Sequence, residues 1–314
     1  MRHFLITMAG TLIKRNPLNS YFVIAITFTA LCWIPTSIIA YLNGYTLLNN
    51  NTFGELIQTG FVDTQHVIIS FIFALGVYGP LIASILVLLT TTSRSGVADL
   101  FSRMKKWRVD KKYYLAIFLI PFILTVPAIA VALVLGIPLP SPFELVVPLQ
   151  FIPLFIIYQI FTSGLEEPGW RGYALPELMK TMTAEKASYK LGVIWSIWHW
   201  PFLIFVTVSN LPIDIAEAGY MMVAMVSIVQ VLLFNVLTMV GMAVIYTWLY
   251  NNTESVFICI IFHALSNIIS LFLMSLIPAA LALIVGILPW VIAMPLLHFY
   301  GSETLTGKEN ILVQ

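Results

Sequence analysis

Apolar residues in this chain gather into eight long runs separated by shorter polar segments. A helix needs roughly 20 apolar residues to cross the hydrocarbon core of a bilayer, and each run is near that length. In chain order the runs cover residues 21–41, 67–89, 113–137, 145–165, 191–208, 221–250, 255–276 and 278–298. The pattern predicts an all-α polytopic membrane protein of about eight transmembrane helices, the sixth of them long enough to be tilted or broken.

The Lys and Arg residues lie between these runs, and their distribution sets the orientation. With the N-terminus in the cytoplasm, all fifteen fall on cytoplasmic segments and none on outer loops. They are Arg2, Lys14 and Arg15; Arg94, Arg103, Lys105, Lys106, Arg108, Lys111 and Lys112; Arg171, Lys180, Lys186 and Lys190; and Lys308. Because positive residues are retained on the cytoplasmic side, this sorting predicts eight spans with both termini cytoplasmic.

Composition narrows the class of protein further. Apolar residues make up 60% of the chain and charged residues 9%, whereas a soluble domain carries about a quarter charged residues. The net charge of +1 leaves no basic face for a nucleic acid. We expect residues 1–314 to form a single integral membrane domain whose main surroundings are the lipid bilayer.

A few polar residues lie where lipid makes them costly, so they are candidates for function. They are Glu166, Glu167 and Arg171 at the end of the fourth run, His199 in the fifth, and His263 with Asn267 in the seventh. His199 follows Lys190 by nine residues and His263 follows Glu254 by nine. At about 1.5 Å per residue both histidines are expected about 13 Å from the cytoplasmic helix ends, facing each other across a cavity open to the cytoplasm.

The expected depth of Glu166 differs from that of the two histidines. A straight helix from residue 145 would place it about 31 Å along the axis, near the inner surface. Pro168 and Gly169 follow, so we expect a kink or a helix restart, with Pro168 at the first position of the new helix. Arg171 is four residues from Glu167, which lets the two pair and leaves Glu166 for chemistry.

These side chains suit hydrolysis. A carboxylate beside a histidine can take a proton from water, and a second histidine with an amide can stabilise the oxyanion of a tetrahedral intermediate. Glu166, His199 and His263 could instead hold a divalent metal such as zinc, with water at the open position. The residues alone leave both arrangements open.

Three motifs in this region resemble those of the CAAX protease and bacteriocin-processing (CPBP) family of intramembrane proteases, relatives of the CAAX prenyl endopeptidases. Residues 166–171 read Glu-Glu-Pro-Gly-Trp-Arg and resemble the Glu-Glu-x-x-x-Arg motif. Trp195 and His199 are similar to the second motif, in which Phe more often holds the aromatic position, and His263 and Asn267 are similar to His-x-x-x-Asn. The motif-bearing core is expected at about 145–276.

The resemblance implies an eight-span helical fold with a conical cavity facing the cytoplasm of a bacterial cell. It implies that Glu166 and His199 activate water and that His263 and Asn267 stabilise the oxyanion. Glu167, Arg171 and Trp195 would be supporting residues. The family is commonly called a metalloprotease family, although the same arrangement works without a metal. The substrate would be a membrane-associated protein or peptide.

Simpler interpretations compete with this hypothesis. The residues around Glu166 could be a charged helix end at the interface, and an intramembrane His or Asn often only bonds helices together. Other polar residues in the runs, namely Gln150, Gln159, Gln230 and Asn235, are predicted to have this packing role. For the whole chain, the alternatives are a non-proteolytic scaffold or a bacteriocin self-immunity protein. A proton-coupled transporter ranks last, because no inverted repeat is visible.

Overall fold

The computed structural model of the protein describes residues 10–139, 147–211, 219–278 and 281–307, which form helices and no strand. Arg2, Lys308 and position 145, where the fourth run begins, lie outside these residues. The helices are α2 (Pro17–Asn43), α3 (Phe53–Thr59), α4 (Thr64–Leu75), α5 (Gly79–Thr91), α6 (Ser93–Met104), α7 (Lys111–Ile123), α8 (Val126–Val134), α9 (Ile152–Phe161), α10 (Glu167–Gly169), α11 (Leu175–Met179), α12 (Ala184–Ser209), α13 (Tyr220–Thr253), α14 (Val256–Met274) and α15 (Ala282–Tyr300). Short 3-10 turns cover Gly76–Tyr78, Leu149–Phe151 and Ser163–Glu166, and Trp170–Ala174 is a π-helical turn.

Seven helical segments in the described part of the chain are long and apolar enough to cross a membrane. They are Pro17–Asn43, Thr64–Thr91, Lys111–Val134, Leu149–Met179, Ala184–Ser209, Tyr220–Thr253 and Val256–Met274, which match the first seven predicted spans. α15 occupies the eighth and packs along α13, although its apolar stretch Ile284–Tyr300 is shorter. The prediction of an all-helical polytopic membrane protein is confirmed.

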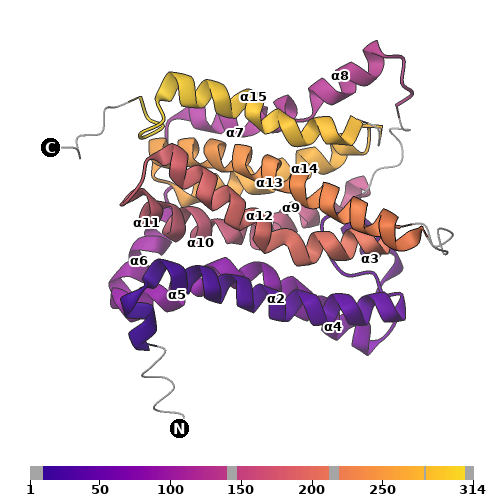
Figure 1. The fold of residues 1–314 in the computed structure, drawn as a ribbon, viewed down its shortest axis with the longest axis horizontal. Coiled ribbons are helices and arrows are strands. Elements are labelled where there is room, and N and C mark those ends of the chain that lie inside the picture. The colour runs from indigo at the N-terminus through magenta and orange to yellow at the C-terminus, as the bar shows by residue number, and fades with distance from the viewer. Residues whose placement is uncertain (1–9, 140–146, 212–218, 279–280, 308–314) are drawn as a thin grey trace, which may run out of the picture.

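The long helices run roughly side by side in three layers (Figure 1). α2, α4 and α5 form one outer layer, α7, α8 and α15 form the other, and α9 to α14 lie between them. In the middle layer α12 packs against α13, and α14 packs against α7 and α9. This middle layer carries every motif residue, so the site is enclosed by helices on both sides.

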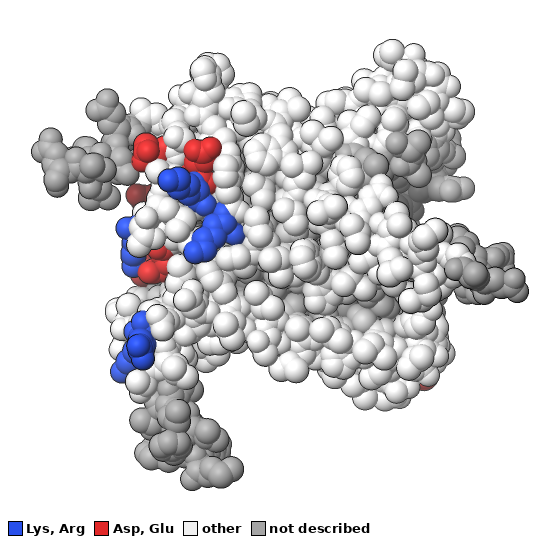
Figure 2. All heavy atoms as spheres, viewed as in Figure 1, with Lys and Arg blue, Asp and Glu red and all other residues white. Residues whose placement is uncertain are grey.

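Charged side chains gather at one end of the molecule, near α6 and α11, while the middle of the visible face is free of them (Figure 2). This is the distribution expected of a protein whose apolar girdle lies in hydrocarbon. We call the end that carries α6 and α11 the charged end. The 44–52 loop between α2 and α3 lies at the opposite end (Figure 1).

The sixth and fourth spans illustrate how local sequence shapes the helices. α13 is one unbroken helix of 34 residues, so the possible break does not occur. The fourth span does restart. α9 ends at Phe161, the Ser163–Glu166 turn follows, and α10 begins at Glu167 with Pro168 as its second residue. Proline is well tolerated there, since its missing N–H would have no partner in the first turn. The restart is followed directly by the π-helical turn, a feature frequent at functional sites.

Candidate active site

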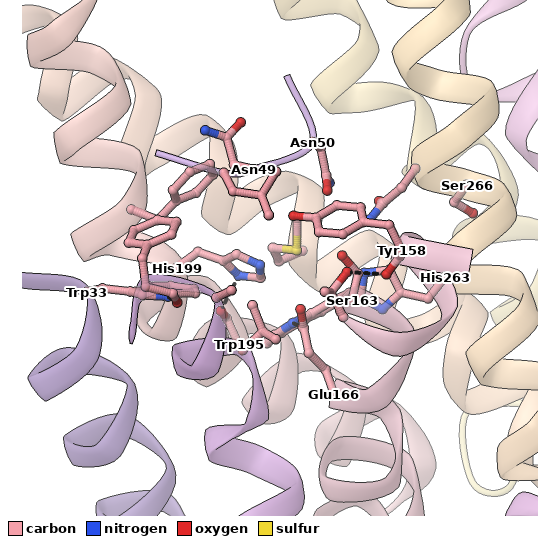
Figure 3. A pocket seen from close by; sticks show the side chains of 18 of the residues that line it. Trp33, Asn49, Asn50, Tyr158, Ser163, Glu166, Trp195, His199, His263 and Ser266 are labelled. Atoms are coloured by element: carbon pink, nitrogen blue, oxygen red, sulfur yellow. Dashed lines mark hydrogen bonds between the residues drawn. The ribbon is translucent and has the colours of Figure 1, made fainter. Parts of the chain in front are cut away.

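The motif residues of three separate segments meet at one cavity of about 180 Å³. Glu166 comes from the end of the 3-10 turn, His199 from α12, and His263 and Asn267 from α14. Figure 3 shows the side chains of Glu166, His199 and His263 approaching the same space from three directions. The helix restart resolves the difficulty with Glu166, because a 3-10 turn in place of a continued α-helix brings its carboxylate to the cavity.

The acidic motif lies in the protein interior and not at the membrane surface. Glu166 is 3% exposed, and Glu167 and Arg171 are fully buried. An interfacial helix end would leave these charges in contact with water and lipid headgroups, so that interpretation is wrong. Burying charged groups is costly unless they are paired and hydrogen-bonded, so their partners decide what the site can do.

Glu166 is held by the indole of Trp195. Trp195 Nε1 donates a hydrogen bond to Glu166 Oε2 at 3.1 Å, and Trp195 itself is 3% exposed. One carboxylate oxygen is thereby fixed, while the side chain as a whole lines the cavity. The arrangement leaves Oε1 as the oxygen that can meet a water molecule or a substrate.

Glu167 joins the first motif to the third. Its Oε2 lies 3.0 Å from Arg171 Nη1, which is the pairing that their spacing predicts, and its Oε1 lies 2.7 Å from His263 Nδ1. A carboxylate oriented in this way fixes the ring of His263, with Nδ1 as the protonated nitrogen. Nε2 is then the nitrogen of His263 that remains for chemistry.

The guanidinium of Arg171 lies between two aromatic rings. Its Cζ is 4.2 Å from the ring centroid of Trp195 and 4.0 Å from that of Tyr246. Cation–π contacts of this kind are worth about 2 kcal/mol or more when they are desolvated. They supplement Glu167 as partners of the charge, since the Nε and Nη2 atoms of Arg171 make no hydrogen bond within the described residues. Tyr246 was not among the predicted site residues, because nothing in its local sequence distinguishes it from other tyrosines.

The helix that carries His199 begins earlier than predicted. α12 starts at Ala184 and not near Lys190, so the predicted starting point for His199 was wrong. The rings of both histidines lie beside that of Trp195, with centroid distances of 5.7 Å for His199 and 5.8 Å for His263. Trp195 is therefore a common neighbour of the two histidines, which line the same cavity.

The tautomer of His199 follows from its backbone partner. Its Nδ1 lies 2.8 Å from the carbonyl oxygen of Trp195, and because a carbonyl can only accept, Nδ1 carries the proton. The neutral ring then has an unprotonated Nε2 with a free lone pair. His199 lines the cavity, so this nitrogen is suited to accept a proton from a bound water.

Asn267 is held by a residue that the sequence did not single out. Asn267 Nδ2 donates to Gln159 Oε1 at 3.0 Å, and Gln159 Nε2 donates to Asn50 Oδ1 at 2.8 Å. The prediction that Gln159 only bonds helices together missed its contact with a motif residue. Because this contact joins residues 108 positions apart, no local pattern could have identified it.

The 44–52 loop supplies part of the cavity wall. Leu48, Asn49 and Asn50 line the cavity, and Figure 3 places both asparagines across it from Glu166. The prediction of a cavity open to the cytoplasm did not include this wall, which comes from the end of the bundle opposite the charged end. Arg171 and Trp170, which follow Glu166 in the chain, are fully buried.

The predicted metal ligands do not form a coordination set. Among the described residues no group of three or more His, Cys, Asp and Glu side chains is placed to hold a metal ion. The nearest partners of Glu166 and of the two histidines are protein groups: Trp195 bonds both Glu166 and His199, and Glu167 bonds His263. The donor set therefore does not fit a zinc site, and the chemistry below contains no step through a metal.

Comparison with known proteins agrees with the motifs. Residues 148–269 match the family model described as type II CAAX prenyl endopeptidase Rce1-like. The resemblance to CAAX endopeptidases is confirmed. Over 120 residues the chain is also 35% identical to CAAX prenyl protease 2 of Methanococcus maripaludis, which is 38% of this chain and 40% of the relative.

The match to the Rce1-like family covers the part of the chain that carries the site. It begins just before α9 and ends within α14, so it includes all three motifs together with Gln159 and Tyr246. α2 to α8 lie outside it, as does the 44–52 loop that contributes Asn50. The chain spans about two fifths of the length of its curated relative.

Proposed function

We propose that this protein is an intramembrane endopeptidase of the CAAX type, which hydrolyses a peptide bond of a membrane-associated protein or peptide. The observation that carries the proposal is that Glu166, His199, His263 and Asn267 line a single cavity. A carboxylate, two imidazoles and an amide are the groups that water activation and oxyanion stabilisation require. The Rce1-like match over the same segment supports the choice of a peptide bond as the target.

In the proposed reaction a water molecule binds between Glu166 Oε1 and His199 Nε2. Loss of a proton from this water to Glu166 makes the oxygen a nucleophile, which attacks the carbonyl carbon of the scissile bond. His199 orients the water through its free lone pair. A C–O bond forms as the carbonyl π electrons move to oxygen and create the oxyanion.

The oxyanion is stabilised from the α14 side of the cavity. Protonated His263 donates through Nε2 while Glu167 holds its Nδ1, and Asn267 donates through the second hydrogen of Nδ2. Collapse of the intermediate breaks the C–N bond, and the proton taken from water passes to the leaving amine. Water is consumed and two peptide ends are released.

The substrate class follows from where the cavity lies. A cavity enclosed by membrane-spanning helices is reached most readily by a chain that is already anchored in the bilayer. The Methanococcus maripaludis relative is named a CAAX prenyl protease. We therefore propose a lipid-anchored C-terminal peptide, with a prenylated Cys-a-a-X peptide as the first substrate to test.

The test is hydrolysis of a farnesylated Cys-a-a-X peptide by the purified protein in detergent, comparing the wild type with Glu166→Gln. Glutamine keeps the size of the side chain but is not a base at neutral pH, so we expect activity to fall at least about hundredfold. Glu177→Gln is the matched control, because Glu177 lies on α11, pairs with Lys180 and does not belong to the cavity lining. Equal activity of Glu166→Gln and the wild type would refute the mechanism.

A second measurement separates proteolysis from a binding or immunity role. In cells that depend on the protein, the variants Glu166→Gln and His199→Ala should lose the phenotype while remaining in the membrane at normal levels. If both variants keep the full phenotype, the protein acts by binding a partner and the endopeptidase proposal fails.

A further inference from the structure

We propose that Gln159 is a positioning residue that orients the amide of Asn267, and that Asn50 of the 44–52 loop completes the same hydrogen-bonded chain. The inference rests on the proposed endopeptidase function and names two residues that the three motifs leave out. Its basis is the continuous sequence of bonds from Asn267 to Gln159 at 3.0 Å and from Gln159 to Asn50 at 2.8 Å.

Gln159 lies behind the site and not in it. It is fully buried on α9, and it is absent from the cavity lining, whereas Asn50 and Asn267 both belong to that lining. Substrate therefore meets the two ends of the chain and not its middle. A residue in this place acts on the reaction only through the neighbours that it holds.

The chemistry of a primary amide explains why such a residue is needed. An asparagine side chain carries a donor group and an acceptor of nearly the same shape, so rotation by about 180° exchanges them with little steric cost. With Oδ1 toward the oxyanion, the contact becomes repulsive. Gln159 Oε1 can only accept, so it selects the orientation in which Nδ2 lies on the correct side, with one hydrogen left to donate.

Asn50 orients the Gln159 amide in the same way. Asn50 Oδ1 accepts from Gln159 Nε2, which fixes the Gln159 amide and directs its oxygen toward Asn267. Asn50 is itself in a rigid setting, because Asn49 bonds the Leu47 carbonyl at 3.0 Å and the Asn51 backbone N–H at 2.9 Å. The loop thus supplies a fixed end for the chain.

Aromatic packing holds the loop against α9. Phe53, the first residue after the loop, lies 4.9 Å from Phe155 and 5.0 Å from Tyr158 between ring centroids. On α9 these two aromatic residues precede Gln159 by four residues and by one residue. The 44–52 loop, α9 and α14 are therefore held together by these contacts, and the orientation of the proposed oxyanion donor depends on all three.

The decisive experiment is a double-mutant cycle on peptide hydrolysis with Gln159→Met and Asn267→Ala. Methionine matches the length of glutamine and removes both hydrogen bonds, so we expect kcat to fall about tenfold to hundredfold while KM changes less than twofold. In the Asn267→Ala background the same substitution should lower kcat by less than twofold, because the group it positions is gone. Gln230→Met, on the exposed face of α13, is the matched control.

The loop end has its own test. Asn50→Leu removes the acceptor oxygen and should lower kcat about tenfold. The variant changes a side chain outside the helical core, so it keeps the inference testable should Gln159→Met fail to fold.

Two results would overturn the inference. One is full additivity of Gln159→Met and Asn267→Ala in kcat, and the other is a rise in KM with kcat unchanged. A failure of the proposed function looks different, because Glu166→Gln would then hydrolyse the peptide as fast as wild type.

Discussion

Trp195 shows how much one residue can contribute to this site. Its N–H bonds Glu166, its ring face contacts the Arg171 guanidinium, and its ring lies 5.8 Å from that of His263. The position was predicted as a supporting aromatic on the strength of its spacing from His199. The structure adds a polar role that phenylalanine could not fill, because phenylalanine has no N–H to donate.

Replacing Trp195 by Phe tests that polar role. The variant keeps an aromatic face for Arg171 but leaves Glu166 without its donor, and a hydrogen bond to a charged group is worth about 1.5–3 kcal/mol. We expect kcat to fall about tenfold or more while the protein remains folded, as measured by peptide hydrolysis and thermal unfolding.

Trp200→Phe is the control for this measurement. It is the same substitution on α12, but Trp200 faces the groove beside α2 and not the cavity. Its kcat should stay at the wild-type value. Wild-type kcat for Trp195→Phe as well would show that the bond to Glu166 has no part in catalysis.

At the scale of the elements, close backbone approaches hold the helices that carry the site. A Cβ at Gly169 would lie 2.4 Å from the backbone of Pro80, so α10 rests directly on α5. A Cβ at Gly192 would lie 2.6 Å from Val240 Cα, so α12 and α13 touch backbone to backbone. Such contacts fix the rotation and offset of each helix and thereby the direction of Glu166 and His199.

Gly192→Ala should therefore destabilise the α12–α13 pair. The added methyl meets backbone atoms that cannot rotate away, and overpacking of this kind costs about 1–3 kcal/mol. Thermal unfolding in detergent measures the effect. In Gly219→Ala, the matched control, the methyl meets nothing within 4 Å, and its stability should be close to wild type. Equal stability of the two variants would show that the α12–α13 contact can relax.

At the scale of the whole molecule, the charge distribution defines a direction across the membrane. Lys106 bonds Glu254 at 3.0 Å at the charged end, far from the 44–52 loop at the other. From the positive-inside rule we propose that the charged end faces the cytoplasm. The proposed orientation then places Asn49 and Asn50, and with them one wall of the cavity, on the outer side.

Cysteine labelling tests this orientation. In a background with Cys32→Ser and Cys259→Ala, a membrane-impermeant maleimide should label Asn51→Cys in intact cells. It should label Lys105→Cys only after permeabilisation. The reverse pattern would invert the orientation while leaving the fold and the site unchanged.

The sequence by itself determined the helical spans and most of the motif residues that meet at the cavity. Span length is a local property, because roughly 20 apolar residues must match the bilayer wherever they occur. The Glu167–Arg171 pair is local as well, since four residues on a helix bring two side chains to one face. The three motifs lie within these spans, and their residue types indicate hydrolysis.

Only the tertiary structure decided how the helices align. It set the rings of His199 and His263 beside Trp195, placed Tyr246 against Arg171, and joined Gln159 to Asn267. Each of these contacts depends on the rotation and axial offset between helices. Those quantities result from many weak packing contacts summed along each interface, and no single segment of the sequence contains them.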